Sequence, residues 1–158
     1  MRITALEEYG LRCMLLLARN DGSTLTLSDF SIREGLSIPY SGKLLTILRK
    51  AELVKAVRGR NGGYALAKRP EEILLKEIFD ALGEPVFSPS HCRKFTGEER
   101  TCVHKEECSV RDIWRGFEGL IGNVLERITL ADILSGNLEI IENLRAVPVS
   151  GDKAVKLS

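Results

Sequence analysis

The sequence has no long apolar stretch. Its longest purely apolar run, Met14 to Ala18, is far shorter than the ~20 residues that a membrane-spanning helix needs. The opening Met1-Arg2-Ile3-Thr4 also lacks the apolar core of a secretion signal. Apolar residues nevertheless make up 44% of the 158 residues, enough for a hydrophobic core, which excludes disorder throughout the chain. We therefore expect a folded, soluble, cytoplasmic protein with no membrane partner.

Motifs of catalysis are missing as well. The sequence has no phosphate-binding loop, no paired carboxylates spaced for acid–base chemistry and no CxxC dithiol. We therefore expect a protein that is not an enzyme. The absence of CxxC also weakens a zinc ribbon and a thioredoxin-like dithiol as explanations for the four cysteines. In a reducing cytosol these cysteines are better explained as free thiols, metal ligands or redox centres than as a disulfide framework.

Acidic residues are nearly absent from residues 43 to 69, where only Glu52 is acidic. Eight basic residues give this stretch a charge of +7, and the rest of the chain carries −6, for a net charge of +1. Such a concentration of positive charge is typical of a surface that binds a polyanion, although a solvated basic surface gives the same pattern. The basic residues are Lys43, Arg49, Lys50, Lys55, Arg58, Arg60, Lys68 and Arg69.

Three helices are predicted at the start of the chain. Apolar periodicity indicates helices at 5–19, 27–34 and 38–51. Ser28 is a candidate N-cap for the second helix and Ser37 for the third. Two short helices joined by a tight turn, after a first helix, are typical of a helix-turn-helix.

A β-hairpin wing is predicted after the third helix. Residues 53–57 and 64–67 alternate in polarity, and the glycine-rich segment 58–63 between them suits a tip that needs positive φ. Pro70 ends the wing, and the apolar pattern of 71–82 predicts another helix closed by glycine.

One long amphipathic helix is predicted in the second half of the chain. Residues 84–108 show little periodicity and are expected to be a loop. Apolar residues then recur at spacings of three and four from Val110 to Ile128. A small winged helix has little free surface to cover such a stripe, so we predict a homodimer formed by helix 110–128. After 131–134 the helical signal weakens.

These elements predict a mainly α fold with a small β-hairpin. The expected organisation is a winged helix-turn-helix DNA-binding domain at 1–83, a cysteine-bearing loop at 84–109, a dimerisation helix and C-terminal segment at 110–145, and a flexible tail at 146–158.

The candidate DNA-reading residues lie in the third helix and the wing. The second helix of a helix-turn-helix enters the major groove with its N-terminal residues against base edges. A wing of this composition reaches a minor groove or a phosphate. Alternatively, Tyr40 is a half-buried packing residue and the arginines only aid solubility. The candidates are Tyr40, Ser41, Lys43, Arg58, Arg60 and Asn61.

Three cysteines lie in one irregular segment. Nine residues separate Cys92 from Cys102, and five separate Cys102 from Cys108. Clustered thiolates are soft ligands for an iron–sulfur cluster or zinc, but the spacing also permits a redox disulfide or unreactive loop cysteines. Cys13 lies among leucines and is expected to be a core residue. A fourth ligand is open, and its candidate donors are His91, His104, Glu106, Glu107 and Glu8.

In several of these features the chain resembles the Rrf-type family of bacterial regulators, whose members include IscR, NsrR, RirA and CymR. The matching motifs, over residues 1 to about 135, are MRIT at 1–4, VRGRNGGYALA at 57–67, three cysteines before Trp114, and TLADI at 129–133. The resemblance implies a homodimer with paired long helices. It also implies an iron–sulfur cluster bound by Cys92, Cys102 and Cys108, with DNA affinity that changes with the state of the cluster.

The sequence departs from parts of the family pattern. Arg111 stands where IscR-like members carry a histidine ligand, and arginine is a very poor ligand because it stays protonated. Glu8 stands at the position on helix one where NsrR-like members carry an acidic ligand, and there it would reach the cluster of the partner subunit. The alternative is that Glu8 is a solvated helix carboxylate. Gly42 replaces a base-discriminating glutamate. The gap before Cys102 is longer than the family pattern, although the gap after it matches.

The resulting prediction is a DNA-binding transcription regulator of operator DNA, controlled by an iron–sulfur cluster that senses redox state, nitric oxide or iron status. The expected ligands are Cys92, Cys102, Cys108 and Glu8, a set that favours 4Fe–4S over 2Fe–2S by resemblance. The alternative is a zinc-stabilised or thiol-switched winged-helix adaptor or regulator without a cluster.

Overall fold

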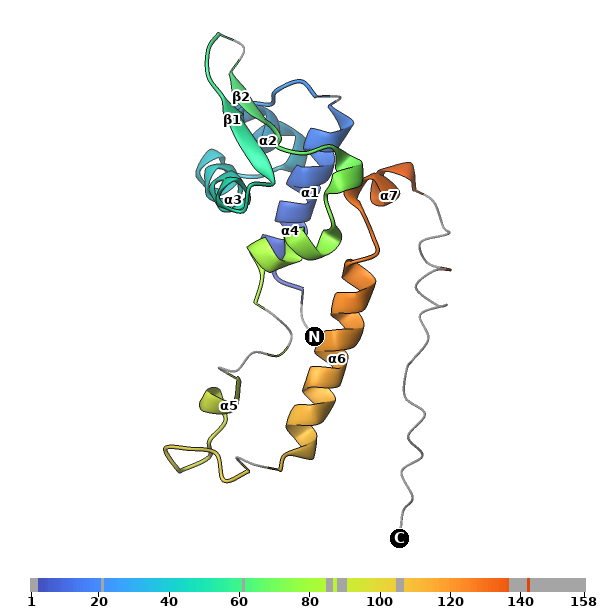
Figure 1. Ribbon diagram of the computed structural model, residues 1–158. Coiled ribbons are helices and arrows are strands. Elements are labelled where there is room, and N and C mark those ends of the chain that lie inside the picture. Colours follow the sequence, from blue (N-terminus) through green and yellow to red (C-terminus); the bar gives the residue numbers. More distant parts are fainter. Residues whose placement is uncertain are drawn as a thin grey trace.

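The computed structural model describes residues 3–20, 22–60, 62–84, 87, 91–104, 107–136 and 142. The predicted tail at 146–158 lies outside these residues. The elements, in chain order, are α1 (Ala5–Arg19), α2 (Leu27–Glu34), α3 (Ile38–Lys50), β1 (Val54–Val57), β2 (Gly63–Leu66), the 3-10 helix η1 (Pro70–Glu72), α4 (Leu75–Leu82), α5 (His91–Lys94), α6 (Ser109–Leu125) and α7 (Leu130–Ser135) (Figure 1).

The first half of the chain forms a winged helix-turn-helix, which confirms the predicted fold class. Helices α1, α2, α3 and α4 enclose the core, and α7 returns to pack against α1 and η1. Figure 1 shows the hairpin projecting from one end of this module and α6 extending from the other. The largest fully buried side chains are Phe30, Met14, Leu44, Leu45, Leu48, Leu53, Ile73, Ile78 and Leu130.

Helix α2 begins at Leu27, so its N-cap lies two residues before the predicted cap, Ser28. The N-cap is Thr26 and not Ser28, because the Thr26 hydroxyl accepts a hydrogen bond from the Asp29 N–H at 3.3 Å. The Asp29 carboxylate accepts one from the Thr26 N–H at 2.7 Å, which completes a capping box. Gly35 ends the helix in the left-handed region at φ 67°, as predicted. Ser37 caps α3, also as predicted.

The wing is an antiparallel hairpin in which Val54 pairs with Leu66 and Val57 with Gly63. Its tip takes positive φ at Gly59, where φ is 114°. A Cβ on Gly63 would lie 2.6 Å from the Leu25 carbonyl oxygen, because the backbone of Leu25 pairs with Tyr64. At this position glycine is required by the close contact of two backbone segments.

The helix predicted at 71–82 is broken. The structure has a 3-10 turn at Pro70–Glu72 and starts α4 only at Leu75. Between them the Leu75 N–H donates to the Ile128 carbonyl at 2.8 Å, and the Leu130 N–H donates to the Ile73 carbonyl at 2.9 Å. These bonds to a distant segment replace the helical hydrogen bonds at the break.

The long helix is shorter than the predicted 110–128. Helix α6 ends at Leu125, and Ile128 lies beyond it with only 8% of its surface exposed, inside the core of the winged helix. Its burial comes from the pairing of this segment with the residues before α4. No residue within α6 is fully buried.

The segment between α4 and α6 contains one helical turn, α5, where only a loop was predicted. Figure 1 shows α5 and the cysteine-bearing segment at the end of the molecule where α6 begins, away from the hairpin. The boundaries 84–109 and 110–145 stay predictions. Within the described residues, none of the helices has the length and apolar character to cross a membrane.

Candidate functional site

Helix α3 turns one face outward. Its buried face is formed mainly by leucines, which pack on the core. Opposite them lies an exposed face that runs from the first turn to the last, at the helical spacing of three and four residues. The exposed residues of this face are Pro39, Lys43, Thr46, Arg49 and Lys50.

Ser41 is a correction to the predicted DNA-reading set. Its side chain is fully buried, and its hydroxyl donates a hydrogen bond to the Ser37 carbonyl at 3.1 Å. A serine on the inward face of α3 cannot meet a base edge, so the prediction for this residue was wrong. Lys43, two positions along, is exposed as a groove contact requires.

Tyr40 is half-buried and packs against the core. Its ring meets the ring of Tyr9 in an edge-to-face arrangement, with centroids 6.1 Å apart and planes at 88°. The packing role that the sequence left open for Tyr40 is therefore present in this structure. Its role in reading DNA stays a prediction.

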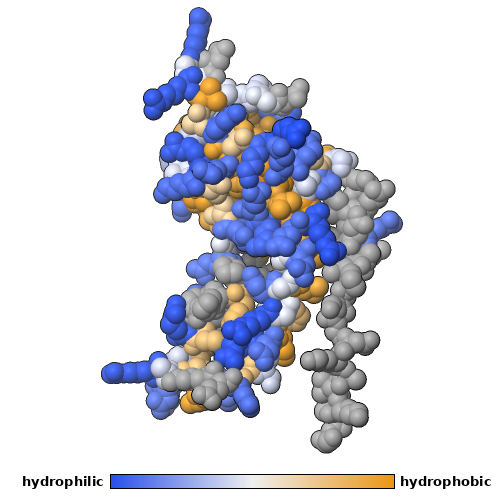
Figure 2. Space-filling model, viewed as in Figure 1, coloured by the Kyte–Doolittle hydropathy of each residue, from blue (hydrophilic) through white to orange (hydrophobic). Residues whose placement is uncertain are grey.

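The wing presents its arginines to solvent. Arg58 and Arg60 are both exposed on the hairpin tip, where Figure 2 shows long hydrophilic side chains projecting. Asn61, the third predicted wing residue, lies outside the described residues. Both arginines are therefore open to solvent on the wing, and their contact with DNA stays a prediction.

Two of the eight cations of the basic stretch are neutralised within the protein. Lys68 pairs with Glu77, and Arg69 pairs with Glu72 at 3.0 Å. Among the described residues, no ion pair involves the other six, which all lie on α3 or the wing. The positive charge left for a polyanion is therefore concentrated on the two elements that the fold turns outward: Lys43, Arg49, Lys50, Lys55, Arg58 and Arg60.

Helix α6 carries an uncovered apolar stripe. Large side chains in its N-terminal two-thirds are 38–62% exposed, and Trp114 lies 5.9 Å from Phe117 between ring centroids. The last turn differs, because Val124 and Leu125 pack against the core of the winged helix. Hydrophobic side chains are visible on this part of the molecule in Figure 2. The exposed residues are Val110, Ile113, Trp114, Phe117 and Leu120.

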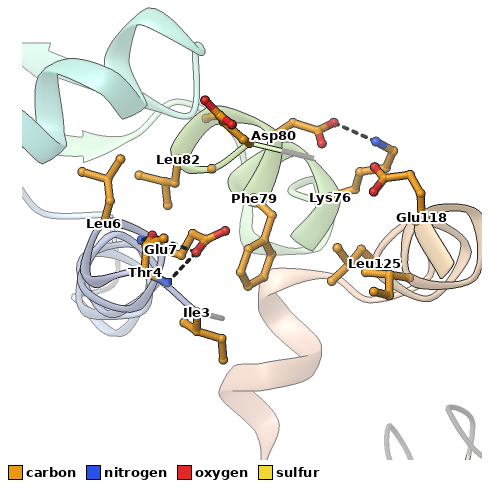
Figure 3. Close-up of a pocket in the computed structure, with 15 residues that line it drawn as sticks. Ile3, Thr4, Leu6, Glu7, Lys76, Phe79, Asp80, Leu82, Glu118 and Leu125 are labelled. Atoms are coloured by element: carbon orange, nitrogen blue, oxygen red, sulfur yellow. Dashed lines mark hydrogen bonds and ion pairs between the residues drawn. The ribbon is translucent and has the colours of Figure 1, made fainter. Parts of the chain in front are cut away.

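A pocket of about 740 Å³ lies between the start of α1, helix α4 and helix α6. Figure 3 shows Phe79 pointing into it, with Ile3 and Leu6 on one side and Leu125 on the other. The residues around the pocket include a Lys76–Asp80 ion pair at 2.8 Å and additional carboxylates. These additional carboxylates are Glu7, Glu84 and Glu118.

The three predicted ligand cysteines are free and half-buried. Cys92 lies on α5, Cys102 in the following loop, and Cys108 at the N-cap of α6. The Cys108 sulfur accepts a hydrogen bond from the Arg111 N–H at 3.4 Å. Three cysteine sulfurs in one segment are donors that suit a soft metal centre. The described residues do not, however, bring three donors together around one point, so ligation requires a different arrangement of this segment.

Glu8 has a partner of its own. One carboxylate oxygen lies 2.6 Å from a guanidinium nitrogen of Arg12, and both side chains are about half exposed. The Arg12 guanidinium lies 5.4 Å from the centroid of the Tyr9 ring. The pKa of Arg12 is raised, chiefly by its hydrogen bond to Glu8. Of the other predicted donors, Glu106 is outside the described residues.

Cys13 is fully buried on α1, as expected of a core residue. Burial raises the pKa of its thiol to about 12. Two residues near the candidate interface were not predicted from the sequence. Arg12 is signalled only by its spacing of four from Glu8, and Thr46 only by continuing the spacing from Pro39 and Lys43 along α3.

Comparison with known proteins gives one family and several relatives. The family model Rrf2, described as "Iron-dependent Transcriptional regulator", matches residues 3–136. The HTH-type transcriptional regulator IscR of Sodalis glossinidius is 34% identical over 143 residues, covering 90% of this chain and 83% of the relative. IscR of Escherichia coli is 32% identical and covers 90% of this chain and 85% of its own.

Solved structures of similar proteins share this fold. IscR of T. potens superimposes with a TM-score of 0.67 at 31% identity, over 86% of this chain and 88% of that one. CymR, the global cysteine regulator of B. subtilis, superimposes with a TM-score of 0.68 at 29% identity, over 87% of this chain and 98% of that chain. The oxidized form of Staphylococcus aureus CymR superimposes with a TM-score of 0.61 at 26% identity, over 85% of this chain and 96% of that chain.

Proposed function

This chain belongs to the Rrf2 family of transcriptional regulators, and we propose that it binds operator DNA as a cytoplasmic homodimer under the control of an iron–sulfur cluster. It is a transcription regulator of the IscR type, since its relatives are named as regulators and not as enzymes. The observation that carries the cluster proposal is the set of three free, half-buried cysteines in one segment.

The homodimer proposal is supported by two surfaces of the same chain. The exposed stripe of α6 is apolar, and the pocket beside α1 is apolar with a mostly acidic rim. Because stripe and pocket are present on every copy, a two-fold pair would bury each stripe against the other chain. Removing several large side chains from water would supply the free energy of association.

The dimer is tested by a charge placed on each face of α6. Phe117→Glu puts a carboxylate in the exposed stripe, and Asn123→Glu puts the same charge on an exposed position of the opposite face. We expect Phe117→Glu to sediment as a monomer and Asn123→Glu to sediment like the wild type. Equal behaviour of the two variants in analytical ultracentrifugation would refute this interface.

In the proposed cluster, Cys92, Cys102 and Cys108 provide thiolates and Glu8 of the partner subunit provides the fourth ligand. When bound, such a cluster supplies chemistry that responds to oxidants, nitric oxide or iron supply. A carboxylate makes the site labile, which suits a sensor better than a structural centre. Following the family resemblance, we favour 4Fe–4S over 2Fe–2S.

The link to DNA follows from where the cysteines lie. Their segment joins α4 of the winged helix to α6, the proposed dimer helix. A change in the conformation of this segment would therefore alter the position of one recognition helix relative to the other. Operator affinity would change without any change in the residues that contact DNA.

Anaerobic purification tests the cluster. We expect a coloured protein with matched iron and sulfide, and loss of the colour in Cys102→Ala with the dimer still folded. Cys13→Ala is the control, since Cys13 is buried away from this segment, and it should stay coloured. A colourless wild-type protein that contains zinc or no metal would contradict the proposal.

Glu8 is tested against its own ion pair. Glu8→Gln removes the carboxylate, whereas Arg12→Gln breaks the same ion pair but leaves the carboxylate available. If Glu8 is a ligand, the cluster is lost faster in air from Glu8→Gln than from Arg12→Gln. Equal rates of loss would mean that Glu8 acts only through Arg12.

A thiol switch without a cluster is the second candidate. The likeness to a CymR structure in an oxidized form favours it, because that protein has the same fold. It predicts a colourless dimer whose operator affinity changes with peroxide and is restored by dithiothreitol. The same cysteine variants and mass spectrometry of the oxidised chain separate it from the cluster, and zinc analysis separates a zinc-stabilised form.

A further inference from the structure

Apart from its cations Lys43, Arg49 and Lys50, the outer face of α3 has few groups that can hydrogen-bond a base. Ser41 is buried, and its hydroxyl donates a hydrogen bond to the Ser37 carbonyl. The exposed Thr46 donates its only hydroxyl proton to the Gly42 carbonyl at 2.7 Å. Both aliphatic hydroxyl groups in the first three turns of the helix therefore donate to the helix itself, which leaves the phenol of the half-buried Tyr40 as the remaining hydroxyl there.

Between these cations, positions 39, 42 and 46 present apolar groups. The Pro39 ring is exposed in the first turn, Gly42 has no side chain, and the hydroxyl of Thr46 points back to the helix, which leaves its methyl group on the outside. A Cβ built on Gly42 would meet nothing closer than the Leu27 methyl groups at 3.9 Å. Glycine is therefore not required by packing here, and the gap is open to whatever the face contacts.

In the major groove, thymine alone among the four bases presents a methyl group. Apolar contacts with that methyl group are made by small apolar side chains and by the threonine methyl. The polar readers of guanine and adenine, which are arginine, lysine, asparagine and glutamine, are absent from positions 39, 42 and 46. Lys43 provides a positive charge beside this face.

We propose that the face formed by Pro39, Gly42 and Thr46 reads thymine methyl groups, so that each half-site places A·T pairs under the first turns of α3. This inference rests on the proposed operator binding. The face discriminates by apolar contact, and Lys43 adds affinity through a phosphate or a neighbouring base.

The test begins with an operator obtained by selection. The full-length protein, purified anaerobically and also after removal of iron, selects tight binders from randomised duplexes. Each thymine of the selected half-site is then replaced singly by deoxyuridine, which lacks only the methyl group. We expect one or two positions to lose about fourfold in affinity, the value for one methyl group removed from water.

Two substitutions at one residue identify the group that reads the base. Thr46→Ser keeps the back-bonded hydroxyl and removes the methyl group, so it should bind thymine and deoxyuridine operators alike. Thr46→Val keeps a methyl group and removes the hydroxyl, so it should still distinguish them. Lys43→Ala should weaken binding to both operators by the same factor.

Three outcomes are distinguishable. Loss of the methyl preference in Thr46→Ser alone is the result expected. A wild-type protein that binds its selected operator but is insensitive to every deoxyuridine overturns the thymine reading and leaves operator binding intact. Failure to select any duplex overturns the proposed function and this inference with it.

Discussion

The ring of Tyr9 on α1 meets the ring of Tyr40 on α3 edge to face, with centroids 6.1 Å apart. The guanidinium of Arg12, which pairs with Glu8, lies 5.4 Å from the centroid of the Tyr9 ring. A continuous set of contacts thus connects the proposed cluster ligand on α1 with the first turn of the recognition helix.

This contact predicts an effect of Tyr9 on DNA binding. Tyr9→Leu removes the edge-to-face partner of Tyr40, an interaction worth about 1 kcal/mol, so operator affinity should fall by up to about fivefold. Tyr9→Phe keeps the ring and should bind like the wild type. Fluorescence anisotropy with labelled operator measures both, and equal affinities for the two variants would show that the ring contact does not position Tyr40.

Arg58 on the wing is expected to contribute to operator binding through its charge. Arg58→Ala should weaken operator binding and lower the slope of log affinity against log salt by about one, because one cation less meets the phosphates. Lys68→Ala is the matched control, since Lys68 is already paired with Glu77 and belongs to the same basic stretch. Titrations at several salt concentrations measure the slopes. A slope for Arg58→Ala equal to the wild-type slope would rule out a phosphate contact.

Cys13 predicts a pH dependence of stability. Burial raises the pKa of its thiol to about 12, whereas an unfolded cysteine has a pKa of about 8.5. The folded state therefore keeps a proton that the unfolded state loses. The stabilisation is complete below about pH 8.5 and is lost as pH rises towards 12, by at most about 1.4 kcal/mol per pH unit.

Urea unfolding under reducing conditions checks this. The free energy of unfolding of the wild type should fall relative to that of Cys13→Ala between about pH 8.5 and about pH 10. A difference between the two proteins that stays constant over this range would mean that the thiol ionises in the folded state.

Glu52 predicts a stabilising substitution. It follows α3 with φ at 59°, in a turn where the Leu53 N–H bonds the Leu48 carbonyl and the Glu52 N–H bonds the Arg49 carbonyl. This is the position at which helices favour glycine, because a Cβ strains the left-handed conformation by about 1 kcal/mol. Glu52→Gly should therefore raise the free energy of unfolding by up to about that amount. Lys50→Gly, inside the same helix, should lower it.

Local signals in the sequence were sufficient for most of the winged helix. Gly35 and Ser37 mark the turn between α2 and α3 because their backbone and side-chain preferences act within a few residues. The glycine-rich tip and the flanking alternation identified the hairpin for the same reason. The clustering of Cys92, Cys102 and Cys108 predicted a metal or redox site, and the family resemblance added the prediction of a cluster with Glu8 as its fourth ligand, which no local rule connects to the cysteines.

The sequence by itself determined the helix-turn-helix, the wing and the uncovered stripe of α6, because these depend on periodicity and on turn residues. Only the tertiary structure decided that Ser41 faces the core, that Ile128 leaves the long helix, and that Thr46 lies on the outer face with its hydroxyl turned inward. The predicted helix is also interrupted before Leu75, because the backbone there pairs with Ile128 and Leu130, far along the chain. The physical reason is the same in each case: which side of a segment is buried, and which partner its backbone finds, depends on neighbours that are distant in sequence.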